Sequence, residues 1–132
     1  MSDNKYLDTI AASAVITDDA RVAEDVKKII DGHADENRNL DVYKFLFNTI
    51  DLTTLKATDS PVSVSNFTEA VNRFEEEYPE LPNVAAICVY PNFAQVVRAV
   101  LEVSDVDIAC VSGGFPSSQT FPEIKVAETS LA

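Results

Sequence analysis

The stretch Val84-Ala85-Ala86-Ile87-Cys88-Val89-Tyr90, followed by Pro91, decides the fold class of this chain. It is a near-continuous apolar run, and such runs are typical of strands that are covered on both faces, as in parallel sheets. The run Val106-Asp107-Ile108-Ala109-Cys110-Val111 repeats the pattern. Between the two runs the spacing predicts a helix with apolar residues on one side: Phe93, Val96, Val97, Val100 and Leu101.

The same alternation extends in both directions from these runs. Ile50–Leu55 is a strand candidate, Thr58–Pro61 is a turn, and a helix follows with one apolar stripe: Val64, Phe67, Val71 and Phe74. After the last strand candidate, Ser112–Gln119 is a loop, and Thr120–Glu123 predicts a capping box with proline in the first helical turn. Three successive βα units predict right-handed crossovers and a parallel sheet.

The first 48 residues read as helical. One helix is expected around Leu7, Ile10, Ala11 and Ala14. Thr17–Asp19 is expected to cap a second helix that ends at Gly32, with one apolar face: Val22, Val26, Ile29 and Ile30. A polar loop from His33 to Asn39 precedes a third, short helix with four inward side chains: Leu40, Tyr43, Leu46 and Phe47. The predicted domains are therefore a helical segment, 1–48, and the βα units, 49–132.

The charge balance excludes several classes of partner. The chain has 10 Lys and Arg against 22 Asp and Glu, a net charge of −12, which repels nucleic acid and anionic membrane surfaces. The densest basic pair, Lys27–Lys28, lies among acidic residues, and His33, the single histidine, is interpreted as a solvated loop residue.

The two cysteines and the N-terminus indicate a compartment. Cys88 and Cys110 lie in apolar runs without CxxC or histidine spacing, which favours free thiols in a reducing cytosol over a disulfide or a metal site. The first residues contain no apolar signal-type segment, and no stretch approaches membrane-spanning length. We therefore expect a cytoplasmic protein.

Three segments, in this order, resemble deoxyribose-phosphate aldolases: Ile50–Asp59 (IDLTTLKATD), Ala86–Phe93 (AICVYPNF), and Gly113–Thr120 (GGFPSSQT) followed by Glu123–Thr129 (EIKVAET). One departure is Asn92, where many family members carry a basic residue. The resemblance implies an α/β fold, a partial TIM (β/α)8 barrel of about three parallel βα units preceded by N-terminal helices, truncated after the third unit.

The resemblance also implies a reaction. The family is a lyase of deoxyribonucleotide catabolism that splits 2-deoxyribose 5-phosphate into acetaldehyde and glyceraldehyde 3-phosphate, through a Schiff base on a lysine and without a cofactor or metal. The Schiff-base lysine, its lysine neighbour and the acidic proton shuttle lie on later strands of the barrel, so we expect no catalytic residue here and no activity of the chain alone. Lys56 and Lys125 match neither lysine and are interpreted as surface charges.

Three residues are implied as substrate-binding by the resemblance: Asp51, Thr53 and Cys88. Asp51 and Thr53 alternate on one strand, so both point into the barrel or both point out. The alternative for Asp51 is bonding to backbone amides at a strand end, and the alternative for Cys88 is a small buried apolar side chain. The Gly113–Gly114 loop is interpreted as a plain strand-to-helix turn rather than an anion site.

Rival functions follow from the missing strands. A partial barrel leaves strand edges unpaired and an inner face open, which predicts a homo-oligomer formed through the exposed sheet, with a scaffold role instead of chemistry. N-terminal helices folded over the sheet would permit a monomer. A small-molecule-binding α/β module that reuses the loops after the strands is a third possibility.

Overall fold

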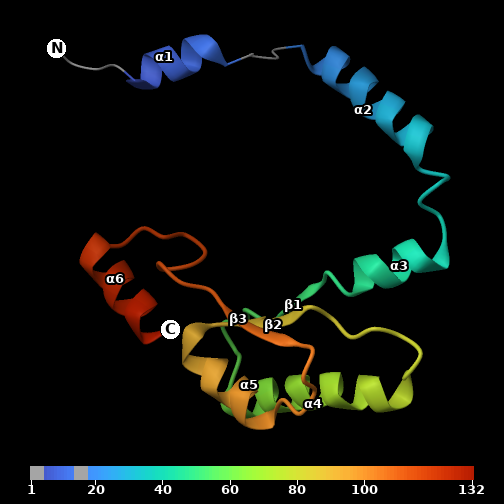
Figure 1. Cartoon of the computed structure of the whole chain (residues 1–132). Helices are drawn as coiled ribbons and strands as arrows, with labels where there is room; N and C mark the ends of the chain where they lie inside the picture. The colour runs from blue at the N-terminus through green and yellow to red at the C-terminus, as the bar shows by residue number, and fades with distance from the viewer. Residues whose placement is uncertain (1–4, 14–17) are drawn as a thin grey trace. The chain divides into compact units, whose positions relative to one another are not determined.

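The computed structural model describes residues 5–13 and 18–132, and the chain divides into two compact units, Met1–Asn39 and Leu40–Ala132 (Figure 1). The second unit includes the third predicted helix as well as the βα units. The functional division into 1–48 and 49–132 remains a prediction. Across the described residues, none of the helices combines the length and the apolar character needed to cross a bilayer.

The first unit contains helices α1, Lys5–Ala12, and α2, Asp19–His33. Asp18 is the N-cap of α2, as predicted, because its carboxylate accepts hydrogen bonds from the amides of Ala20 and Arg21 at 3.0 and 3.2 Å. Two residues that enter the predictions for these helices, Ala14 and Thr17, lie outside the described residues.

The predicted end of α2 is wrong. Gly32 lies inside the helix, which continues to His33, and the next residue, Ala34, keeps right-handed helical angles (φ −63°, ψ −40°). No left-handed residue is used at this end, so glycine has no special advantage here. His33 is therefore the last helical residue instead of a loop residue, and its exposed ring pairs with Glu36.

The second unit is built on a three-stranded parallel sheet in the order β1-β2-β3. The strands are β1, Asp51–Thr53, β2, Ala86–Val89, and β3, Asp107–Cys110, all shorter than the predicted runs. The pairing joins Leu52 to Ile87 and Ile87 to Ile108, without a stagger. The predicted α/β class and parallel sheet are confirmed.

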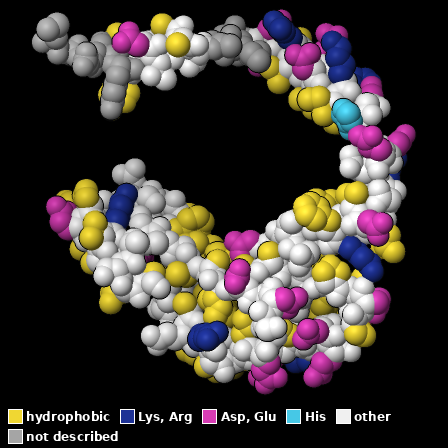
Figure 2. Space-filling model, in the orientation of Figure 1, with side chains coloured by type: hydrophobic (Ala, Val, Ile, Leu, Met, Phe, Trp, Pro, Cys, Tyr) yellow, Lys and Arg dark blue, Asp and Glu magenta, His cyan; other side chains and the backbone are white. Residues whose placement is uncertain are grey.

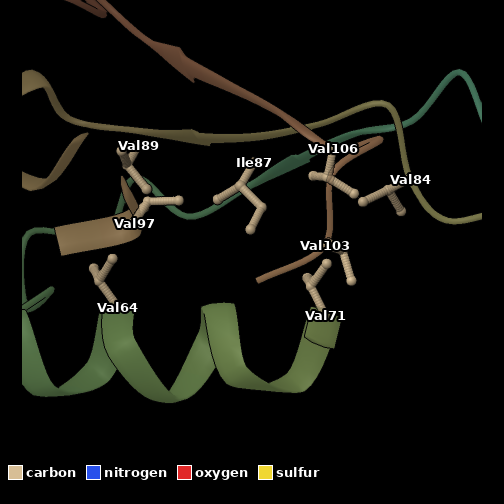
Figure 3. Packing of buried hydrophobic residues seen from close by; sticks show 8 residues of the cluster. All are labelled: Val64, Val71, Val84, Ile87, Val89, Val97, Val103 and Val106. Carbon is tan, nitrogen blue, oxygen red and sulfur yellow. The ribbon is translucent and has the colours of Figure 1, made fainter. Parts of the chain in front are cut away.

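Helices cover one face of this sheet (Figure 1). Four helices belong to the unit: α3, Leu40–Phe47, α4, Pro61–Glu77, α5, Ala94–Val100, and α6, Pro122–Leu131, with a 3-10 turn at Pro91–Phe93 before α5. Side chains from α4, α5 and the sheet meet in one core, in which Val64, Ile87 and Val97 are fully buried (Figure 3). Fully burying such a side chain stabilises the fold by ~1.5–3 kcal/mol.

Two predictions about coverage are wrong. The apolar strand runs suggested helices on both faces, but the other face carries Asp51 and Thr53, both exposed. The inward face predicted for α3 is also mostly uncovered, since Leu40, Tyr43 and Leu46 are more than half exposed. Only Phe47 packs inward, where its ring stacks on Phe74 with the centroids 5.2 Å apart.

Helix capping differs from the prediction at the starts of α4 and α6. α4 begins with a full capping box in which Ser60 and Ser63 bond each other's backbone amides, so Pro61 is the first helical residue and not the end of a turn. α6 has no side-chain cap, and its N-cap is Phe121 instead of the predicted Thr120. The physical reason is Pro122, which forces an extended conformation on the residue before it (φ −66°, ψ 142°).

Candidate active-site face

The open face of the sheet carries the three residues implicated by the sequence. Successive strand residues point to opposite faces, so the residues that alternate with core-facing Leu52 and Ile87 lie on the open side. These are Asp51 and Thr53 of β1 and Cys88 of β2, and Thr53 pairs directly with Cys88. Asp107 and Ala109 of β3 continue the two rows.

Cys88 is buried although no helix covers it, with 7% of its surface exposed. Burial raises the pKa of its thiol above the ordinary value of 9.0, and the negative charge of Asp51 raises the pKa further, while hydrogen bonding by Thr53 lowers it. Thr53 pairs with Cys88 and Asp51 lies two residues before Thr53 on the same side of β1, so the three side chains lie close together. The thiol form is favoured at neutral pH, which makes Cys88 a weak nucleophile.

Thr53 and Asp51 have different surroundings. The Thr53 hydroxyl donates a hydrogen bond to the backbone carbonyl of Asp51 at 2.9 Å. The Asp51 side chain is exposed at the start of β1, in the row that also contains Ala86 and Asp107. Its carboxylate is thus open to a ligand on this face.

The loops at the carboxyl ends of the strands are held by hydrogen bonds. After β1, the Asp59 carboxylate accepts bonds from the Thr54 hydroxyl and from the Lys56 amide. The Tyr90 hydroxyl, at the end of β2, donates to the Leu55 carbonyl at 3.3 Å. Sequence reasoning missed both links. Asp59 carries a local turn signal, but Tyr90 lies 35 residues from its acceptor and leaves no local pattern.

The loop after β3 is closed by its own helix. Gly113 and Gly114 both have positive φ angles, 72° and 77°, which glycine adopts without strain. The Gly114 amide donates to the Glu128 carboxylate at 2.7 Å. An internal carboxylate thus occupies the Gly114 amide, and the interpretation of this loop as a plain turn stays a prediction.

The lysines lie at the surface of the unit. Lys56 is exposed and Lys125 is half-buried on α6. Within residues 5–13 and 18–132, no cluster of three or more His, Cys, Asp or Glu side chains is arranged to hold a metal ion. Both cysteines in this part of the chain are free thiols.

A sequence relative and a structural neighbour can be set beside this geometry. No family model matches the chain. A Caenorhabditis elegans protein named "Putative deoxyribose-phosphate aldolase" is 31% identical over 119 residues, a match that covers 87% of this chain and 38% of that protein. A crystal structure of a Coccidioides immitis protein with the same name superimposes with a TM-score of 0.53 over 67% of this chain and 32% of that chain, at 22% identity.

Fold and neighbour together define the class, an α/β protein with three parallel strands that form part of a (β/α)8 barrel. The chain is similar in sequence to deoxyribose-phosphate aldolase, and the resemblance predicted from its three motifs is confirmed. It spans less than two-fifths of the length of the relative that it matches.

Proposed function

We propose that this chain supplies one wall of a deoxyribose-phosphate aldolase site, with Asp51, Thr53 and Cys88 in contact with 2-deoxyribose 5-phosphate, and that it is inactive alone. The observation that carries the proposal is the placement of these three side chains on the uncovered face, where Thr53 pairs with Cys88 and Asp51 lies two residues before Thr53 on the same side of β1. In a barrel this face is the interior, where substrates bind at the carboxyl ends of the strands.

The roles of the three residues follow from their chemistry. The Asp51 carboxylate and the Thr53 hydroxyl hydrogen-bond the hydroxyl groups of the sugar, and the neutral Cys88 thiol packs against its carbon chain. A Schiff base needs an unprotonated lysine, which requires a desolvated or cation-flanked pocket. Exposed Lys56 has no such pocket, and we propose that the imine-forming lysine is none of the lysines described here.

Reductive trapping tests the catalytic half of the proposal. The chain is incubated with 2-deoxyribose 5-phosphate and sodium borohydride, and the intact mass is measured, with a complete deoxyribose-phosphate aldolase as the positive control. We expect no reduced adduct and no glyceraldehyde 3-phosphate. An adduct mapped to Lys56 or Lys125 would overturn the claim that the imine-forming lysine is absent.

Titration by NMR tests the binding half. Adding 2-deoxyribose 5-phosphate is expected to shift the amide signals of Thr53 and Cys88, and Asp51→Asn is expected to weaken binding. Asp107→Asn, the same change in the same row of the sheet, is the matched control. Equal weakening by both variants would show that the loss of binding does not come from a specific contact with Asp51.

Location and chain organisation belong to the same proposal. We propose a cytoplasmic location, which the two free thiols support. We further propose that 49–132 carries the aldolase-derived function and that 1–48 is accessory to it.

A further inference from the structure

We propose that Asp59 and Glu128 are positioning residues that hold the two loops at the ligand-bearing edge of the sheet in one conformation. The proposal rests on the proposed function, because it concerns the shape of the same site. Their hydrogen bonds go to Thr54, Lys56 and Gly114 and not to the three side chains assigned to substrate binding. Each acts through the backbone of a loop that begins where a strand ends, one after β1 and one after β3.

Asp59 hydrogen-bonds two other residues of the loop after β1. Both of its carboxylate oxygens lie 2.9–3.0 Å from the Thr54 hydroxyl, and one accepts the Lys56 amide at 2.9 Å. Thr54 is 7% exposed and its own amide bonds the Cys88 carbonyl, so it is anchored in the sheet. Asp59 therefore ties the outer part of the loop to a fixed point.

A second contact joins this loop to the neighbouring strand. Between Thr54 and Lys56, the Leu55 carbonyl accepts a hydrogen bond from Tyr90, the residue that follows β2. The loop after β1 is thereby fixed both to its own turn and to the end of β2. Thr53 and Cys88 are the last and the next-to-last residues of these two strands, so this edge adjoins the proposed site.

Glu128 does the same for the loop after β3. Its carboxylate accepts the Gly114 amide at 2.7 Å, and the adjacent Thr129 hydroxyl lies 2.6 Å from the Ser112 hydroxyl. A Cβ at residue 114 would come within 3.2 Å of the Thr120 side chain, so the loop is closely packed at this glycine. Residues near the end of α6 thus hold the loop that precedes the helix through hydrogen bonds.

Two loops at the same edge of the sheet are held by carboxylates, and this favours a role in shaping the site. Loops at strand ends are ordinarily the mobile parts of a fold, yet they carry the ligand contacts in parallel α/β proteins. Here two of them are held by carboxylates, the loop after β1 by Asp59 within the loop and the loop after β3 by Glu128 of the helix that follows. A site kept in one conformation binds its ligand without a cost in ordering.

The experiment measures loop protection and ligand affinity in variants of Asp59 and Glu128. Asp59→Ala and Glu128→Ala are compared with Glu75→Ala and Glu123→Ala, exposed carboxylates of α4 and α6. Amide hydrogen exchange is measured at Lys56 and Gly114, and affinity is measured by NMR titration with 2-deoxyribose 5-phosphate. Urea unfolding of each variant distinguishes an effect on the loop from a loss of the fold. Asp59→Asn and Glu128→Gln are conservative replacements that keep an acceptor oxygen.

We expect each variant to act on its own loop. Losing a hydrogen bond to a charged acceptor should speed exchange about tenfold, at Lys56 for Asp59→Ala and at Gly114 for Glu128→Ala. Sugar-phosphate binding should weaken by a similar factor, with partial recovery in the conservative variants. The control variants should change neither quantity.

Three outcomes overturn the proposal in distinguishable ways. Unchanged exchange would show that the carboxylates do not hold the loops. Faster exchange with unchanged affinity would show that the loops are held but play no part in the site. Failure of the unaltered chain to bind the sugar phosphate would remove the proposed function and the ligand-positioning role with it, while the exchange data would still decide whether the loops are held.

Discussion

The Cys88 thiol lies where burial and the Asp51 carboxylate both disfavour its thiolate form, so its pKa is raised. Asp51→Asn removes the negative charge and should therefore lower this pKa toward the ordinary value. The measurement is the pH dependence of alkylation by iodoacetamide, with Cys110→Ala as the background so that one thiol remains in the chain. Asp107→Asn is the control, and an identical profile in both variants would rule out a specific effect of Asp51.

The same residue makes stability depend on pH. A thiol with a pKa raised in the folded state contributes stability that is fully present below the unfolded pKa, near 9.0, and is lost as the pH rises through the folded value. The free energy of unfolding, measured in urea at successive alkaline pH values, should thus decline less steeply in Cys88→Ala than in the unaltered chain. Parallel declines would show that other groups dominate.

At the scale of elements, the starts of α4 and α6 predict different losses of stability for similar substitutions. Ser60→Ala breaks the capping box of α4 and should lower the free energy of unfolding by about 1 kcal/mol. Thr120→Ala, at the position that the sequence pattern favours as a cap, should change it by less than about 0.5 kcal/mol because α6 has no side-chain cap. Urea unfolding midpoints at constant m-value check both. A large loss for Thr120→Ala would contradict the start of α6 described above.

For the whole molecule, uncovered apolar surface and net charge act against each other. Figure 2 shows hydrophobic side chains among Asp and Glu side chains on the visible face of residues 40–132, and those of α6 are well exposed, with Leu131 at 90%. The net charge of −12 opposes association of identical chains. Raising the salt from about 0.1 M to about 1 M shortens the screening length from about 10 Å to about 3 Å and should strengthen self-association, measured by light scattering across protein concentrations.

Two substitutions that each introduce a negative charge test which surface joins the chains. Ala109→Glu places a charge on the open face of β3, and Ile124→Glu places the same charge on α6. If chains associate through the sheet, as the sequence predicts, the first variant abolishes association and the second does not. The reverse pattern would assign the contact to α6, and a monomer at every salt concentration would remove the prediction of a homo-oligomer.

The sequence by itself determined the order of the elements and the parallel sheet, because apolar periodicity and local caps such as Asp18 are encoded within a few residues. It also placed Asp51 and Thr53 on one side of a strand, since side chains alternate along any strand. Only the tertiary structure decided that this side is the uncovered one, because that depends on where α4 and α5 pack. The Tyr90–Leu55 and Glu128–Gly114 bonds likewise join residues 35 and 14 positions apart, and such contacts arise from chain packing and leave no periodic pattern in the sequence.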